Sequence, residues 1–156
     1  MSVAENMYDP FRKVSDLDDS EKLRILVVED NAADAWLIEN ALANIPHVGN
    51  ITHVNDGAQA LQMIDSGYLA PDLAIIDLQM PHVDGFKLLV ELGCRELNDF
   101  PKIVLTSSMA RSDYVRSRLR GAARVFTKPD SLEELSALLT RTILNIKVNS
   151  EAEESA

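Results

Sequence analysis

The sequence predicts one α/β domain in which five strands alternate with five helices around a doubly wound parallel sheet. Three observations predict it: five short apolar runs recur along the chain, each is followed by apolar residues at helical spacing, and the alternation fills residues 23–148. With 156 residues and 46% hydrophobic residues, the chain can bury a core of ordinary size. We therefore divide the sequence into a flexible acidic arm (1–22), a folded domain (23–148) and an acidic tail (149–156).

The first half of the domain supplies two strands and two helices. LRILVV (23–28) is short, apolar and β-branched, which is typical of a central parallel strand. The stretch DNAADAWLIENALANI (30–45) has apolar residues at helical spacing and polar residues at its start that can cap a helix. NITHV (50–54) predicts the second strand, and the turn at Asp56-Gly57 leads into the helical stretch AQALQMI (58–64).

The second half repeats the alternation three times. LAIID (73–77), KIVLT (102–106) and RVFT (124–127) predict strands. GFKLLVEL (85–92) and SDYVRSRLRG (112–121) predict helices, the second ending at its glycine. Ser131 and Glu134 have the spacing of a capping box and predict the start of a last helix that reaches about residue 148.

Charge and composition exclude several functions. The formal net charge is -10, of which -4 lies in residues 1–21 and -3 in residues 151–156. An acidic chain lacks the basic surface that nucleic acid or an anionic membrane requires, so we expect no binding to either. The single cysteine, Cys94, cannot form an internal disulfide, and we expect a cytoplasmic protein.

Polar side chains collect where the predicted strands end. Glu29 and Asp30 follow the first strand, Asp77 ends the third, Thr106 ends the fourth and Lys128 follows the fifth. In open α/β sheets, ligands bind beyond the carboxyl ends of the strands. We therefore expect three carboxylates, one hydroxyl and one ammonium to meet at a single edge of the sheet.

This set of groups suits phosphoryl transfer to an aspartate. Clustered carboxylates repel one another and favour a hard cation such as Mg²⁺. A carboxylate can attack phosphorus, while a metal ion, a lysine and a hydroxyl stabilise the charge on the phosphoryl oxygens. Asp77 is then the candidate phosphoacceptor.

Four segments resemble the receiver domain of two-component response regulators: VVEDN (27–31), DLQMPHVDG (77–85), the LTS that contains Thr106, and the TKP of Lys128. The resemblance implies a flavodoxin-like sheet with strand order 2-1-3-4-5. It also implies that Asp77 accepts a phosphoryl group from a histidine kinase or a histidine phosphotransfer protein. In that family the output is a changed partner-binding surface, and the only chemistry is self-phosphorylation and self-dephosphorylation, so we expect no enzyme.

The resemblance also implies roles for individual residues. Glu29, Asp30, Asp77 and the backbone carbonyl of Gln79 would hold Mg²⁺, and Thr106 and Lys128 would bind the phosphoryl oxygens. Gln79 and Ser108 would tune the lifetime of the phosphate. The bond before Pro129 would be cis.

Two further features concern the switch and its partners. Receivers often have an aromatic residue three positions before the lysine, whereas this chain has Val125 there and Phe126 next to it. The usual coupling between threonine and aromatic ring is therefore in doubt. The loop from Cys94 to Pro101 and the TKP segment are similar to those of stand-alone receivers paired with phytochrome-type kinases.

Several alternatives remain open. The same fold can serve as an interaction scaffold that works without phosphorylation. A phosphatase with an aspartyl nucleophile usually needs a second acid where this chain has Gln79. We interpret Asp34 as a favourable charge at a helix N-terminus. Trp36 is either a docking anchor or half-buried, and the arginines of residues 111–124 form a solvated face or bind an acidic partner. A homodimer through the fourth helix, fifth strand and fifth helix is also expected.

Overall fold

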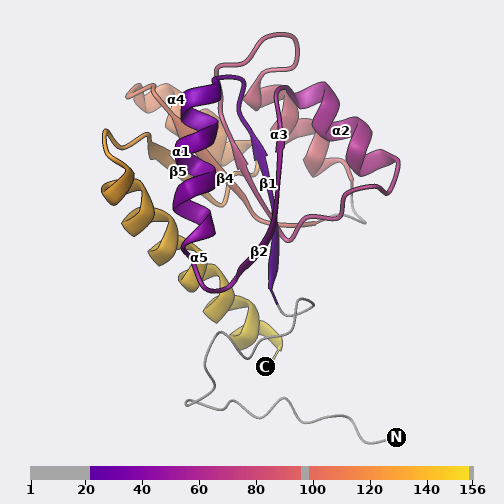
Figure 1. Ribbon diagram of the computed structural model, residues 1–156. Helices are drawn as coiled ribbons and strands as arrows, with labels where there is room; N and C mark the ends of the chain where they lie inside the picture. Colours follow the sequence, from indigo (N-terminus) through magenta and orange to yellow (C-terminus); the bar gives the residue numbers. More distant parts are fainter. Residues whose placement is uncertain (1–21, 96–98, 155–156) are drawn as a thin grey trace, which may run out of the picture.

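A computed structural model describes residues 22–95 and 99–154, of which residues 147–154 are described by their backbone alone (Figure 1). The predicted N-terminal arm therefore lies almost entirely outside the described residues. No helix in the described parts of the chain combines the length and apolarity needed to cross a membrane.

Five parallel strands form one sheet with the order β2-β1-β3-β4-β5. The strands are β1 (Leu23–Val28), β2 (Val48–Val54), β3 (Leu73–Ile76), β4 (Lys102–Thr106) and β5 (Arg124–Thr127). This order confirms the predicted doubly wound α/β fold. The order reverses between β1 and β3, so the strand ends on either side of this point are the expected place for a site.

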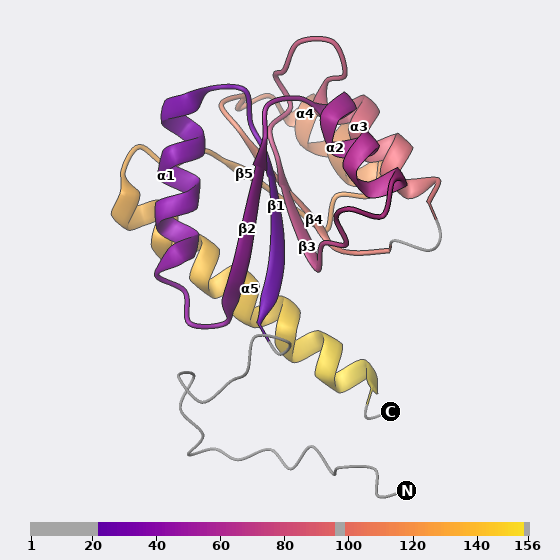
Figure 2. The same ribbon diagram turned by 45° about the vertical axis from the view of Figure 1, so that its right-hand side comes forward.

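Five helices connect the strands. They are α1 (Ala32–Ala43), α2 (Gly57–Asp65), α3 (Gly85–Gly93), α4 (Arg111–Leu119) and α5 (Leu132–Glu154). Helices α1 and α5 cover one face of the sheet, whereas α2, α3 and α4 cover the other (Figures 1 and 2).

Each face of the sheet has its own hydrophobic core, because successive side chains of a strand point to opposite faces. Ile25 and Val27 of β1 belong to the cluster that contains the buried residues of α1 and α5. Leu26 and Val28 belong to the cluster with α2 and α3. All four side chains are at most 1% exposed, so β1 is buried on both faces, as its continuous apolar run predicts.

Most helices begin at a polar residue that caps the first turn. Asn31, Asp56, Asp84 and Ser131 accept hydrogen bonds from backbone N–H groups three residues ahead, over 2.7–3.1 Å. The predicted helix start at Ser131 is therefore correct. Helix α4 differs: it starts after Ala110, whose side chain makes no capping hydrogen bond, and Ser117 is its one buried residue among those described.

Some element boundaries differ from prediction. Strand β2 starts at Val48 rather than Asn50, since Leu23 pairs with Val48 across a register irregularity. Strand β3 ends at Ile76, so Asp77 lies just beyond the strand. Helix α5 continues to Glu154 and passes the expected end near residue 148. The division into arm, domain and tail remains a prediction.

Candidate functional site

The ends of β1, β3 and β5 bring a lysine and several carboxylates together. Lys128 Nζ lies 2.9 Å from Glu29 Oε2 and 3.6 Å from Asp77 Oδ1. The backbone N–H of Lys128 donates to the Thr106 carbonyl over 2.8 Å, which fixes the lysine next to the end of β4. The Asp77 N–H donates to the Val28 carbonyl over 3.0 Å, which fixes Asp77 next to the end of β1.

Three acidic residues form a compact group that we call the carboxylate cluster: Glu29, Asp30 and Asp77. Each offers one oxygen, and these oxygens all lie within 4.8 Å of one another. Glu29 is 1% exposed and Asp77 5% exposed, whereas Asp30 is exposed. One face of the cluster is therefore open to solvent and could admit a cation with water ligands.

Burial disfavours the ionised form of two of these carboxylates. It raises the pKa of Glu29 to about 7, even though Lys128 and the Asn31 N–H oppose the shift and Asp77 adds to it. Burial also raises the pKa of Asp77 against the opposing charge of Lys128. A divalent cation would remove both penalties, because it neutralises charge that Lys128 alone does not compensate.

Lys128 has a third carboxylate partner that the sequence analysis missed. Its Nζ donates to Asp34 Oδ2 over 2.8 Å, although the two residues are 94 positions apart. Burial alone would lower the pKa of Lys128, but the hydrogen bond to Asp34 and the ion pair with Glu29 outweigh it and raise this pKa to about 12. Asp34 is in the first turn of α1, as predicted, but the interpretation as a helix-end charge alone is incomplete.

Gly85 allows α3 to start directly against the loop that holds Asp77. A Cβ at this position would lie 2.3 Å from the Asp77 carbonyl oxygen and 2.7 Å from Leu78 Cα. The Gly85 N–H also donates to the Leu78 carbonyl over 3.2 Å. Because both neighbouring groups are backbone, a side chain here would have to displace the segment that carries Asp77.

Thr106 and Ser108 connect the site to α4. Thr106 is buried, and its Oγ1 accepts a hydrogen bond from the Ser108 N–H over 3.1 Å. The Ser108 hydroxyl donates to Asp113 Oδ2, in the first turn of α4, over 2.5 Å. A shift of Thr106 would therefore reach α4 through this pair of hydrogen bonds.

Val125 and Thr106 lie on the neighbouring strands β5 and β4, in which Val125 pairs with Val104 and Thr106 pairs with Thr127. Val125 and Thr106 line one hollow, together with Tyr114 of α4. Val125 packs against the core shared with α3, whereas Phe126 packs against the core shared with α5. Phe126 therefore belongs to the opposite face of the sheet and does not take the place of the missing aromatic residue.

Two other expectations concern the loops. Gln79 lies two residues beyond Asp77 and is exposed. No cis peptide bond occurs among the described residues, so the bond between Lys128 and Pro129 is trans. The isomer implied by the resemblance is therefore wrong for this structure.

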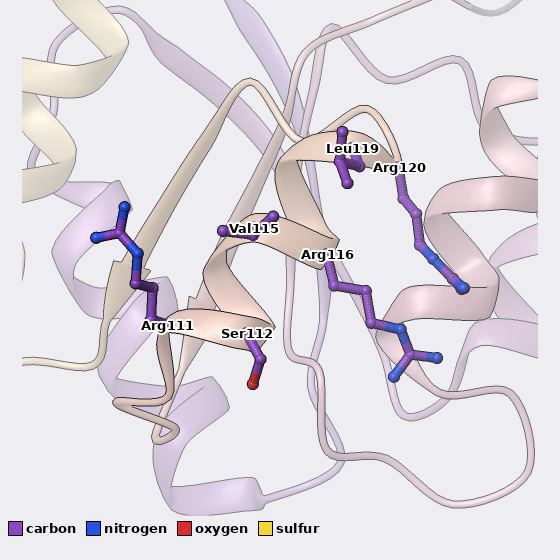
Figure 3. A pocket seen from close by; sticks show the side chains of 6 residues that line it. All are labelled: Arg111, Ser112, Val115, Arg116, Leu119 and Arg120. Carbon is purple, nitrogen blue, oxygen red and sulfur yellow. The ribbon is translucent and has the colours of Figure 1, made fainter.

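A separate hollow lies on the outer face of α4 and contains none of the clustered carboxylates (Figure 3). Its lining residues are Arg111, Ser112, Val115, Arg116, Leu119 and Arg120. The guanidinium groups of Arg116 and Arg120 lie 3.9 and 5.8 Å from the centre of the Phe86 ring on α3. These two arginines thus pack against a neighbouring helix of the same chain. They are therefore neither fully solvated nor fully available to a partner, which were the two interpretations of the arginine-rich face.

Trp36 is 58% exposed on α1, which favours the exposed alternative over half-buried packing.

A doubly wound sheet with a carboxylate cluster and a lysine at its strand ends defines a class of α/β domains with an acidic site at the switch point of the sheet. The family model "Response regulator receiver domain" matches residues 25–140, and the chain belongs to this family. Receiver domains are signalling phosphoacceptors of two-component systems, which agrees with the sequence-based expectation.

Individual relatives agree with this assignment. The chain is 34% identical to the probable methanogenesis regulatory protein FilR2 of Methanothrix harundinacea over 79% of this chain and 80% of that protein. It superposes on a structure of the phosphorylated cyanobacterial phytochrome response regulator RcpA with a TM-score of 0.72 and 29% identity, covering 78% of this chain and 91% of that chain. For the Mn²⁺-bound response regulator Rcp1 the TM-score is 0.69 at 26% identity, covering 76% and 89%.

Many other curated relatives are longer proteins. The chain spans between 15% and 54% of the length of several of them. For these relatives the similarity concerns the receiver part alone.

Proposed function

We propose that the protein is a stand-alone response regulator receiver that accepts a phosphoryl group on Asp77 from a histidine kinase or a histidine phosphotransfer protein. The observation that carries the proposal is the meeting of Asp77, two further carboxylates and Lys128 at the strand ends. The chain covers 80% of FilR2 and 91% of the RcpA chain, which supports the stand-alone part. A cytoplasmic location remains a prediction.

The proposed reaction moves one phosphoryl group. An Asp77 carboxylate oxygen attacks phosphorus, a P–O bond forms, and the N–P bond of the donor phosphohistidine breaks, with its electron pair returning to the imidazole nitrogen. Lys128 would supply positive charge to the phosphoryl oxygens, and the Thr106 hydroxyl would donate to one of them. In self-dephosphorylation, water would attack phosphorus, the P–O bond to Asp77 would break, and phosphate and the free Asp77 carboxylate would be the products.

Mg²⁺ fits the donor set of this site. Glu29, Asp30 and Asp77 offer three oxygens within 4.8 Å of one another, and the Gln79 carbonyl is the fourth proposed ligand. Hard oxygen donors with an open, solvated side suit Mg²⁺. When bound, the ion would neutralise charge on the transferring phosphoryl group. The raised pKa values of Glu29 and Asp77 support a site that is incomplete without a cation.

The test is phosphate incorporation from acetyl phosphate, followed by intact mass with Mg²⁺ or with a chelator. We expect one added phosphoryl group in the wild type with Mg²⁺, and none after Asp77→Asn. Asp72→Asn is the matched control, because Asp72 is a surface carboxylate paired with Arg24 over 3.2 Å and should not affect incorporation. If the wild type neither gains phosphate nor binds BeF₃⁻, the interaction scaffold becomes the better explanation.

The proposal includes a homodimer through the surface of α4, β5 and α5. Leu119 is 83% exposed and Val115 is 42% exposed on α4, so apolar area is available there. Leu119→Lys should abolish dimer formation in analytical ultracentrifugation with BeF₃⁻ present. Tyr68→Lys should not, because Tyr68 lies in the loop that follows α2 and, although 81% exposed, is outside the proposed interface. A dimer that persists after Leu119→Lys would place the contact elsewhere.

A further inference from the structure

Lys128 is bonded more closely to Asp34 than to the proposed phosphoacceptor. Its Nζ lies 2.8 Å from Asp34 Oδ2 and 3.6 Å from Asp77 Oδ1. The first distance is that of a charge-assisted hydrogen bond, and the second is too long for one. In this structure the ammonium is therefore held at the N-terminal turn of α1.

The two short contacts of Lys128 differ in how easily they can break. Glu29 is 1% exposed, so a Glu29 carboxylate without the ammonium would be buried and unpaired. The Asp34 side chain is 36% exposed, so water can replace the ammonium when the contact opens. Breaking the Asp34 contact is thus the less costly way for Lys128 to move.

A phosphoryl group on Asp77 would compete for the same ammonium. The Lys128 ammonium donates a hydrogen bond to Asp34, and it forms an ion pair with Glu29 Oε2 at 2.9 Å without a hydrogen bond to that oxygen. The phosphoryl group brings three oxygens and nearly two negative charges to the site. Asp34 opposes it in two ways, because it holds the lysine and because its own negative charge repels the phosphoryl oxygens.

We propose that Asp34 is a positioning residue that holds Lys128 in the resting protein and releases it when a phosphoryl group binds at Asp77. This inference rests on the proposed phosphoacceptor function. It makes the first turn of α1 part of the switch, since the Asp34 carboxylate loses its partner on phosphorylation. The contact between Asp34 and Lys128 also lowers the affinity of the site for a phosphoryl group, because this partly exposed ion pair must break first.

The alternative is that Asp34 only stabilises α1. An acidic residue in the first turn favours a helix whether or not it touches Lys128. Glu133 provides the matched comparison, because it is an exposed acid in the first turn of α5. Both residues would then affect stability, and neither would affect ligand affinity.

The experiment is a titration with BeF₃⁻, a phosphoryl analogue, in excess Mg²⁺. Trp36 is the only tryptophan in the chain and lies on α1, two residues after Asp34, so its fluorescence can report binding. We expect Asp34→Ala to bind about fivefold more tightly than the wild type, as loss of an ion pair worth about 1 kcal/mol requires. The affinity of Asp34→Asn for BeF₃⁻, with the side-chain size kept, should lie between those of Asp34→Ala and the wild type. The affinity of Asp34→Glu should return toward that of the wild type, and Glu133→Ala should leave the affinity unchanged.

A crystal structure of metal-free Asp34→Ala gives a readout that needs neither Mg²⁺ nor phosphate. We expect Lys128 Nζ to move within about 3 Å of an Asp77 oxygen, the range of a hydrogen bond. Unchanged or weaker BeF₃⁻ binding by Asp34→Ala and Asp34→Asn, with normal binding by the wild type, would overturn this inference alone. Failure of the wild type to bind BeF₃⁻ would overturn the proposed function, and this inference with it.

Discussion

Replacing the proposed phosphoacceptor should stabilise the metal-free protein. Asp77→Asn removes a negative charge that lies within 4.8 Å of the Glu29 and Asp30 oxygens. At an effective dielectric constant of about 20, each repulsion at that distance is about 3.5 kcal/mol, while the attraction of Lys128 at 3.6 Å is about 4.6 kcal/mol. Asp30 is exposed and its repulsion is partly screened, so repulsion exceeds attraction by about 1–2 kcal/mol.

Burial adds to this effect, because an amide costs less to desolvate than a carboxylate. We therefore expect Asp77→Asn to raise the free energy of unfolding by about 1–2 kcal/mol at about pH 8, or the melting temperature by about 3–6 °C. The assay is urea and thermal unfolding in a chelator, repeated with Mg²⁺. Excess Mg²⁺ should reduce the difference, since it stabilises the wild type by binding the folded state.

Asp72→Asn is the control with the opposite expected sign. It removes a surface ion pair with Arg24 and should cost at most about 1 kcal/mol. Destabilisation by Asp77→Asn in the chelator would refute the reasoning, because it would mean that Lys128 compensates the whole cluster.

Two further predictions concern the same region. Gly85→Ala should lower the free energy of unfolding by about 1–3 kcal/mol and weaken BeF₃⁻ binding, because its Cβ would meet the Asp77 backbone; Gly93→Ala, with open space around its Cβ, should cost nothing. Equal unfolding midpoints for the two variants would contradict this. Since the pKa of Glu29 is raised to about 7, the metal-free protein should lose stability as the pH rises from about 4.5 through 7. Mg²⁺ should then raise the melting temperature more at about pH 8 than at about pH 5.5, because at the lower pH it must displace the proton on Glu29. An equal rise at both pH values would exclude Glu29 as the group responsible for the pH dependence.

Much of the fold follows from local pattern. The buried run of β1 and the alternation of strands and helices are visible in the sequence, because a strand covered on both faces needs apolar residues throughout. The boundaries are harder to predict. Val48 joins β2 through pairing with Leu23, and no property of residues 48–50 alone reveals that partner.

The site shows the same division. Strand-end positions were enough to predict that Asp77 and Lys128 meet, since parallel strands end at one edge. Asp34 was missed because its contact depends on how far the loop after β5 reaches toward α1, and the two partners are distant in the sequence. The sequence feature that could have predicted this contact is the position of Asp34 in the first turn of the helix that follows Asp30, since that turn lies at the same edge of the sheet.

The sparse attachment of α4 has a consequence for motion. The helix buries Ser117 alone among its described residues and starts without a side-chain cap. Its amides should therefore exchange with solvent deuterium sooner than those of the fully buried strands, through openings that leave the rest of the domain intact. A helix that opens in this way needs little free energy to change its conformation, so a small displacement of Thr106 and Ser108 would be sufficient to shift its population of states.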